Sequence, residues 1–281
     1  MLSLVRSGNE DYGFIQHRED SMKKYLKLWF VMTSRITQIA FVSRFGVIFF
    51  TFGKIVRFLF FLFFLVFLVG KTKLVAGYTL WEVILFFLTF NMVDIISQFL
   101  FREVYRFRSY IVSGSFDYLL TKPISPLLRS LFGGSDILDL ITLFPLIGFL
   151  IYTLSRLEAI TIIGVFFYIL LLTNALIIML AFHIFVLGLG VLVTEVDNAI
   201  WIFRELTALG RIPIAVYREP LSWVLTFIIP VGIMITFPVH AALGVLSFQA
   251  IIVAFLISGA LLFGSLRFWR YALRHYTSAS S

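Results

Sequence analysis

Residues 58–67 read FLFFLFFLVF, ten apolar side chains of which six are phenylalanine. Water cannot solvate a contiguous apolar run of this size, so it must face lipid or the inside of a protein. The whole chain has the same character, because 60% of its 281 residues are hydrophobic and only 14% are charged. A soluble domain has about 45–50% apolar and about 25% charged residues. The sequence therefore predicts an integral membrane protein and excludes a free cytosolic enzyme.

Six segments of the chain are apolar enough to cross a membrane. A helix needs about 20 largely apolar residues to cross roughly 30 Å of hydrocarbon. The segments that meet this requirement are residues 46–69, 80–100, 137–154, 160–193, 221–237 and 248–268. We therefore predict an all-α integral membrane protein with six transmembrane helices. The fifth segment contains Pro230, and we expect a bend there because proline has no backbone N–H to donate.

The basic residues predict the orientation of these helices. With both chain ends in the cytoplasm, the inner side holds 20 lysines and arginines, counting Lys54 and Arg57, whose long side chains can extend to the inner surface. The outer loops hold only three, Lys71, Lys73 and Arg156. Because inner loops are enriched in Lys and Arg, both chain ends are predicted to be cytoplasmic. The net charge of +8 then indicates contact with an anionic inner leaflet, and no nucleic acid partner is expected.

Composition divides the chain into four parts. Residues 1–21 form a polar N-terminal tail. Residues 22–45 alternate apolar side chains with lysine and arginine, which is typical of an amphipathic helix lying on the inner leaflet. Residues 46–270 form the six-helix transmembrane domain, which includes a long cytoplasmic loop at 101–135. Residues 271–281 form a cytoplasmic C-terminal tail.

The sequence offers no catalytic or metal-binding motif. Cysteine is absent, and the four histidines are scattered without the spacing of metal ligands. Residues 70–72 read GKT, like the end of a phosphate-binding loop, but Leu65 stands where that motif requires its first glycine. We therefore expect a non-catalytic chain that has no metal or cofactor of its own and does not itself bind ATP.

Four carboxylates lie at or near the ends of the predicted spans: Glu82, Asp94, Asp136 and Asp139. A charge in hydrocarbon is costly and by default indicates a functional site. These positions are close enough to the helix ends for lipid headgroups to solvate them, or for the carboxylates to cap helices. Solvated helix ends and caps are the main interpretation, and a functional role is the alternative. The sequence places no carboxylate at mid-depth, which disfavours an ion-driven carrier.

The long inner loop differs from an ordinary turn. Gly114, Pro123 and Pro126 interrupt any long helix, and Phe116 and Leu120 offer apolar contacts on a charged background. Exposed apolar groups rimmed by charge mark interaction sites, so the pattern suits docking to a soluble partner. The alternative is a membrane-surface loop whose phenylalanine and leucine side chains dip into lipid.

A family resemblance favours docking. Residues 114–123, GSFDYLLTKP, resemble the G-x-F-D-x-L-L-x-x-P segment of permease subunits in the ABC-2 exporter superfamily, specifically a six-helix branch of uncharacterised ABC transport permeases. Residues 77–79, GYT, resemble the start of the second span in that branch. Residues 237–244 resemble its aromatic-proline turn before the last helix. Together these matches extend over most of residues 22–270.

The resemblance implies a permease that dimerises with a second copy or a homologous permease, in contact with membrane lipid. Its inner loop would supply a coupling helix seated in a separate ABC ATPase subunit, which would hold ATP and Mg²⁺. The coupling positions implied are Arg102, Arg106, Arg108, Gly114, Phe116, Asp117, Leu120 and Pro123. Residues 238–247 would form a re-entrant element on the outer side, and its marked positions are Pro238, His240 and Gly244.

The function implied is that of the membrane subunit of an ATP-driven exporter in a prokaryotic plasma or inner membrane. A pathway lined by Phe, Leu and Ile with few charges at mid-depth favours an amphipathic or lipid-like substrate, moved out of the cytoplasm or the inner leaflet. Two alternatives stay open. One is an ion-coupled secondary transporter, which would transport without an ATPase. The other is a membrane scaffold or assembly factor, which would dock a partner and transport nothing.

Overall fold

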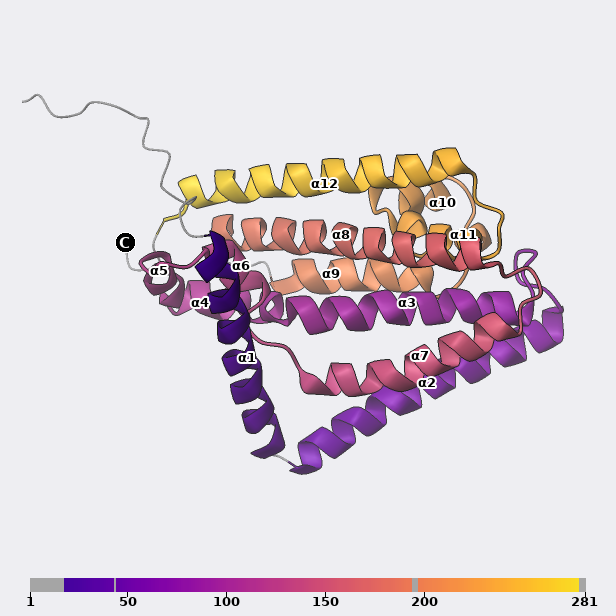
Figure 1. Cartoon of the computed structure of the whole chain (residues 1–281), viewed down its shortest axis with the longest axis horizontal. Helices are drawn as coiled ribbons and strands as arrows, with labels where there is room; N and C mark the ends of the chain where they lie inside the picture. The colour runs from indigo at the N-terminus through magenta and orange to yellow at the C-terminus, as the bar shows by residue number, and fades with distance from the viewer. Residues whose placement is uncertain (1–17, 43, 194–196, 278–281) are drawn as a thin grey trace, which may run out of the picture.

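Figure 1 shows a computed structural model of the chain, which describes residues 18–42, 44–193 and 197–277. Within these residues the regular structure is helical, apart from one isolated bridge between Val75 and Tyr78. The predicted tails at 1–21 and 271–281 lie partly outside the described residues. The predicted all-helical fold is therefore confirmed for the part of the chain that the structure describes.

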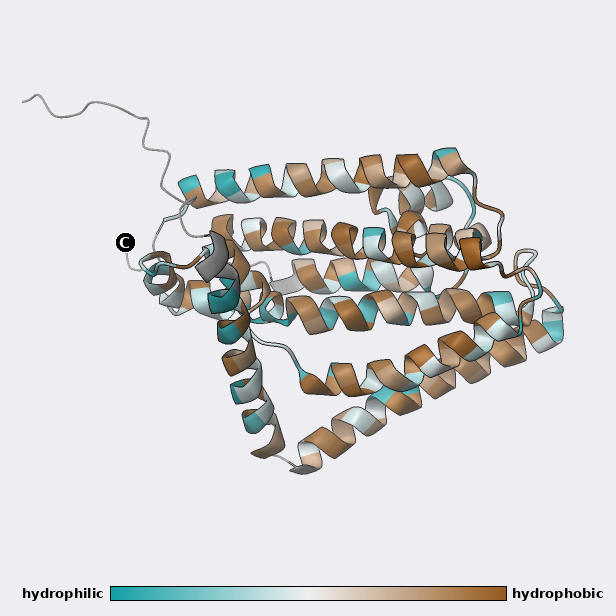
Figure 2. Cartoon of the chain, viewed as in Figure 1, coloured by the Kyte–Doolittle hydropathy of each residue, from teal (hydrophilic) through white to brown (hydrophobic). Residues whose placement is uncertain are grey.

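Within the residues that the structure describes, five helices are long and apolar enough to cross a membrane. They are α2 (Arg44–Thr72), α3 (Leu80–Phe101), α7 (Ile137–Ser155), α8 (Ile162–Leu192) and α12 (Phe248–Arg274). Figure 1 shows α3, α8 and α12 side by side, with α2 and α7 together along one flank. Apolar residues dominate all five (Figure 2). Five of the six predicted spans thus correspond to single helices, with ends that differ by a few residues.

The predicted bend at Pro230 is also present. Leu221–Ile228 and Gly232–Ala242 meet at a break that contains this proline, and their axes differ by 75°. The first part comprises α10 (Leu221–Trp223) and η4 (Val224–Ile228), and the second η5 (Gly232–Thr236) and α11 (Phe237–Ala242). Such a pair is either one broken span or a re-entrant loop, so the described residues contain five segments, or six if the bent pair is one span, that are long and apolar enough to cross a membrane.

Helix α1 (Arg18–Val42) lies across one end of the bundle, steeply inclined to the other helices (Figure 1). Polar and apolar residues alternate along it (Figure 2), and it overlaps most of the helix predicted at 22–45, whose position on the inner leaflet stays a prediction. It is held to the loop before α7, where Trp29 Nε1 donates to Ser135 Oγ at 3.1 Å and the Ser135 amide donates to Thr33 Oγ1 at 3.1 Å.

The long loop between α3 and α7 folds into short helices at the same end of the bundle (Figure 1). They are η1 (Arg102–Arg106), α4 (Phe107–Val112), α5 (Ser115–Leu120) and α6 (Pro126–Leu131). Gly114 separates α4 from α5 with φ +71°, a left-handed conformation that glycine adopts without steric cost. Ser125 accepts a hydrogen bond from the Leu128 amide and caps α6. We call residues 102–131 the inner segment, and the end of the bundle that carries it the loop end.

The segment after α8 departs from the sequence prediction. Residues between the fourth and fifth predicted spans were expected to form an inner loop, yet α9 (Asp197–Ala208) is a helix that packs against α8, with Ile200 and Phe203 buried and Trp201 and Ile202 exposed. Phe203 stacks on Phe182 of α8 with ring centroids 4.3 Å apart. η2 (Leu209–Arg211) continues α9, and η3 (Ile214–Val216) follows it. Charged residues lower the mean hydropathy of α9, so a search for apolar segments does not find it.

The tightest packing joins α8 to α12. Phe185 stacks on Phe268 with centroids 4.7 Å apart, and Gly188 faces the same ring so closely that a Cβ would overlap it. Nearer the opposite end of the bundle, Ser258 Oγ donates to Asn174 Oδ1 at 2.5 Å, and both residues are buried. This helix pair provides a rigid support on which the inner segment rests.

Candidate functional site

A cavity of about 470 Å³ lies between α2, α3, α7 and the segment formed by α9 and η2. Its wall is charged toward the loop end and aromatic further into the bundle. The charged residues are Lys54, Arg57, Asp94, Asp139, Arg204 and Arg211, and the aromatic ones are Phe58, Phe60, Phe61, Phe87, Phe90 and Phe149. We call this space the central cavity. Its volume falls within the range of about 300–1,000 Å³ that is usual for small-molecule sites.

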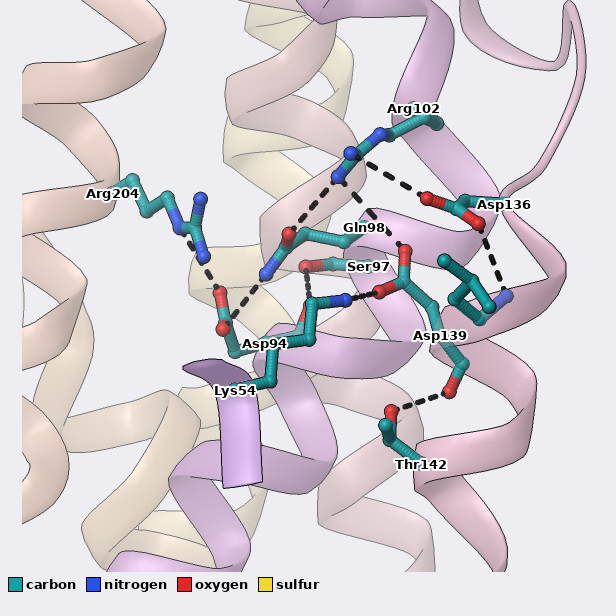
Figure 3. Close-up of polar contacts among 10 residues, drawn as sticks. Lys54, Asp94, Ser97, Gln98, Arg102, Asp136, Asp139, Thr142 and Arg204 are labelled. Atoms are coloured by element: carbon teal, nitrogen blue, oxygen red, sulfur yellow. Dashed lines mark hydrogen bonds and ion pairs between the residues drawn. The ribbon is translucent and has the colours of Figure 1, made fainter. Parts of the chain in front are cut away.

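Asp139 anchors the charged wall near the start of α7. It is 1% exposed and forms an ion pair with Lys54 of α2 (Figure 3). Its second oxygen, Oδ2, accepts no hydrogen bond in the described part of the chain, and Arg102 Nη1 lies 3.9 Å from it. Asp136 instead accepts from the Leu138 amide at 3.0 Å and caps α7, so the prediction of a capping carboxylate is confirmed at this position.

Asp94 of α3 continues the network toward α9 (Figure 3). Gln98 Nε2 donates to its Oδ2 at 2.8 Å, and Arg204 Nε lies 3.6 Å from its Oδ1. Gln98 also accepts from Arg102 Nη1 at 3.3 Å, which joins this group to Asp139. Four helices are therefore linked by one polar network. The prediction that lipid headgroups solvate Asp94 is wrong, because its side chain is buried beside Arg204. Asp139 lies in the first turn of α7, as predicted for a carboxylate at the positive end of the helix, and is also buried and paired with Lys54.

Two arginines of the cavity form no ion pair with any carboxylate in the described part of the chain. Arg211 places its guanidinium 4.9 Å from the ring centroid of Phe90, in the middle of α3, and 5.7 Å from that of Phe61. Arg57 lies one helical turn before Phe61 on α2. Among the described residues, neither arginine has a carboxylate oxygen within ion-pair distance. Asp94, by contrast, already has Arg204, and Asp139 already has Lys54.

A second acidic centre organises the inner segment. Glu103 is 1% exposed, and both of its carboxylate oxygens are bound. Oε1 accepts from Arg129 Nη1 at 2.7 Å and from the Tyr110 hydroxyl at 2.6 Å, and Oε2 accepts from Arg106 Nη1 at 3.2 Å. Gly133 lies against this group, and a Cβ there would overlap the Glu103 and Arg129 side chains. The Glu103 centre therefore fixes η1, α4 and α6 to one another.

Phe116 was expected to be exposed to a partner, and this prediction is wrong. The side chain is 0% exposed, with its ring 5.2 Å from that of Phe107, 5.3 Å from Tyr276 and 6.5 Å from Trp269. The turn at Gly114 directs α5 back toward α12, so its first apolar residue points into the bundle. Burial and the neighbouring Asp117 carboxylate raise the pKa of the Tyr276 hydroxyl to about 12.

Some of the other predicted coupling positions make contacts that hold the helices together, and others are exposed on the surface. Arg102 belongs to the cavity network, and Arg106 to the Glu103 centre. The Pro123 carbonyl accepts from Lys24 Nζ of α1 at 3.1 Å. Between α4 and the start of α6, the charged and large apolar or aromatic side chains that are exposed are Arg108, Val112, Tyr118, Leu120 and Lys122. We call these five residues the inner patch. Its docking role stays a prediction.

The outer positions implied by the resemblance lie together at the opposite end of the bundle. The Tyr78 hydroxyl and His240 Nε2 are 2.7 Å apart, and both rings pack on Phe86. Pro238 is buried in the first turn of α11, and Gly244 follows that helix with φ +72°. Residues 77–79 and 237–244, far apart in the sequence, therefore form one structural unit.

Sequence reasoning missed Arg204 and Arg211 as site residues because it assigned them to a loop. A usable signal was the presence of Lys54 and Arg57 inside an apolar stretch. Charges so placed require partners. The candidate partners were the carboxylates at the start of α7 and in α3. That α9 belongs to the same network is seen only in the folded structure.

Comparison with known proteins assigns the chain to a family. Residues 54–280 match the family model described as ABC-2 family transporter protein. No curated protein and no solved structure matches the chain. The matched residues include α3, the inner segment, the central cavity and the outer unit around His240, so they cover most of the described fold. The chain therefore belongs to the ABC-2 transporter family.

Proposed function

We propose that this ABC transporter permease is the membrane subunit of an ATP-driven exporter. It works as a dimer with a second permease and is driven by a separate ABC ATPase that docks on the inner patch. ATP and Mg²⁺ are assigned to that partner, since the sequence has no phosphate-binding loop. The cargo is an amphipathic or lipid-like molecule moved out of the cytoplasm or the inner leaflet of a prokaryotic plasma membrane.

The observation that carries this proposal is the way the inner segment is attached to the bundle. Its exposed side chains, Tyr118 and Leu120, belong to the same short helix as the buried Phe116. Phe116 packs on Trp269 of α12, and the Glu103 centre holds the same segment to the end of α3. A partner that moves the inner patch would therefore move the ends of two crossing helices with it.

This attachment supports a two-state mechanism. A ligand shifts a conformational equilibrium only by its differential affinity for the two states. Here the ligand is ATP on the partner, and the inner segment transmits its effect. Because Arg102 connects the start of η1 with the cavity network at Asp139, displacement of the segment would also alter the central cavity. Access to the cavity would then alternate between the two sides of the membrane.

The topology we propose places the loop end in the cytoplasm. α9 would enter the membrane from that side, since Arg204 pairs with Asp94 and Arg211 reaches Phe90 in the middle of α3. α9 and the residues after it would then make the fifth crossing. The bent pair Leu221–Ala242 would be re-entrant from the outer side. Residues 238–247 and the Tyr78–His240 pair would close the path there.

The test is a pair of charge substitutions on the inner patch. Tyr118→Arg and Leu120→Arg place new charges on exposed positions, and we expect loss of ATPase co-purification and of ATP-dependent transport with normal insertion in the membrane. Arg156→Glu at the opposite end is the matched control, because that residue is also exposed. Full ATPase association in both patch variants would contradict the docking assignment.

An ion-coupled carrier remains the second candidate, because Asp94 and Asp139 are buried. Each carboxylate is already paired with a cation of the polar network, so neither is held apart as a binding group for a coupling ion. The two candidates differ in one measurement. A carrier would transport in liposomes that contain the permease alone under a proton or sodium gradient, whereas the proposed exporter would not.

A further inference from the structure

We infer that the central cavity binds an anionic amphiphile, with its oxyanion head at Arg57 and Arg211 and its apolar tail among the phenylalanines. The inference deepens the proposed function, on which it rests for the identification of this molecule as the exported cargo. The binding site itself follows from the charges and shape of the cavity alone.

The charge balance of the wall is the first argument. Four cations and two carboxylates line the cavity. Lys54 pairs with Asp139 and Arg204 with Asp94, which leaves Arg57 and Arg211 without a carboxylate in the described part of the chain. Arg57 and Arg204 lie close enough to repel Arg211, while Asp94 and Glu205 attract it from beyond ion-pair distance. Arg57 is exposed, whereas Arg211 is partly buried, and a cation without an ion-pair partner is costly where water is excluded, so an anion bound at Arg211 would reduce that cost.

The position of Arg211 is the second argument. Its guanidinium faces the rings of Phe90 and Phe61, and it donates no hydrogen bond to any described residue. Rings that cover the guanidinium leave its N–H groups free at the edge. A guanidinium edge presents two parallel donors, which match the oxygens of a phosphate or a carboxylate. Arg57 supplies a second cation on the facing helix, so a phosphate monoester with two charges fits the pair best.

The aromatic wall is the third argument. Phe58 and Phe61 of α2 each pack on Phe87 of α3 with ring centroids 5.0 Å apart. Phe149 of α7 adds to the same apolar region. A soluble anion would leave these rings without a partner, whereas an aliphatic chain would fill the space beside them. The cavity volume of about 470 Å³ suits one head with a single chain better than a two-chain lipid.

The binding test uses the purified permease in a non-ionic detergent, without the ATPase. Native mass spectrometry would compare palmitoyl lysophosphatidic acid with palmitoyl lysophosphatidylcholine, which has the same tail but no net negative charge. Palmitate tests whether a carboxylate head is sufficient, and inorganic phosphate tests whether the head binds without an apolar tail. We expect lysophosphatidic acid to bind at least roughly tenfold more tightly than the choline form, and palmitate to bind between them, since charged hydrogen bonds account for the difference.

Arg211→Gln should weaken lysophosphatidic acid binding roughly 10- to 100-fold, because it removes a charged bidentate donor. Arg57→Gln, at an exposed position that folding does not require, should weaken it in the same direction. Arg218→Gln is the matched control, since that arginine is exposed and lies outside the cavity. Equal affinity for the choline form, unchanged binding in both cavity variants, or equally tight binding of inorganic phosphate would overturn the site.

The cargo assignment is tested separately. Proteoliposomes that contain the permease and its ATPase should export the lysophosphatidic acid when ATP is present, and Arg211→Gln should abolish export with the ATPase still attached. Tyr118→Arg should lose the ATPase but still bind the amphiphile. Binding without ATP-driven export would overturn the substrate class. Loss of the ATPase in the Arg211 variant would contradict the division of the chain into a docking site and a cargo site.

Discussion

Glu103 and Asp139 are both carboxylates with 1% exposure, yet their surroundings differ. Glu103 accepts three hydrogen bonds, two from arginines and one from a tyrosine, and both of its oxygens are used. Asp139 pairs with Lys54, but its second oxygen accepts no hydrogen bond from the described residues, and the adjacent cavity holds arginines without a carboxylate. A complete network rigidifies a fold, while an incomplete one beside a cavity is typical of a site that acts on a ligand.

The largest effect should follow removal of the charge at Glu103. Glu103→Gln leaves Arg129 and Arg106 without their counter-charge, and breaking a buried pair costs about 3–5 kcal/mol. We expect a large fall in the thermal unfolding temperature of the purified protein. Glu158→Gln, at an exposed position, is the control. An unchanged unfolding temperature would show that the Glu103 centre is not structural.

Gly133→Ala tests the same centre without a change in charge. The new methyl group would overlap the Glu103 and Arg129 side chains, and overpacking of this kind costs about 1–3 kcal/mol. Gly148→Ala on α7 is a matched control, because its Cβ would meet no atom within 4 Å and alanine favours a helix. Denaturant unfolding should separate the two variants. Equal unfolding midpoints for the two variants would show that the close approach at Gly133 does not limit stability.

At the cavity we expect a smaller loss of stability and a larger loss of function. Asp139→Asn should destabilise the protein by about 1–2 kcal/mol, less than Glu103→Gln, because Lys54 is 22% exposed and can reach the membrane surface. Transport should fall much more than stability. The double variant Lys54→Met with Asp139→Leu should recover the stability without recovering transport, since it removes both charges together. If the double variant also recovered transport, the Lys54–Asp139 pair would have a structural role only.

The smallest effect should come from Tyr110→Phe. This change removes one donor to Glu103 and leaves both arginines in place, so the loss should be about 1 kcal/mol. A double-mutant cycle with Arg129→Gln would measure the coupling between the two donors. A loss as large as that of Glu103→Gln would mean that the tyrosine, and not the ion pairs, holds the centre together.

The sequence was sufficient for the parts of the fold that depend on local pattern. Apolar length predicted five of the crossing helices, alternating charge predicted α1, and the chemistry of proline predicted the bend at Pro230. The capping of α7 by Asp136 was within the alternatives considered. Each of these depends on residues that are neighbours in the chain.

What the sequence could not predict depends on contacts between distant segments. From the sequence alone, α9 is predicted to be a charged loop. The structure shows a helix in which Arg204 lies beside Asp94. From the sequence alone, Phe116 is predicted to be exposed. In the structure Trp269 of α12 packs against it. In both cases the neighbour that decides burial lies far along the chain, so neither composition nor periodicity contains the answer.

The most direct test of the account is transport by the reconstituted permease, with and without its ATPase. We predict that palmitoyl lysophosphatidic acid leaves the inner leaflet of proteoliposomes only when the ATPase and hydrolysable ATP are both present. A non-hydrolysable ATP analogue should support no sustained transport. Equal transport by the permease alone, driven by an ion gradient, would contradict the account.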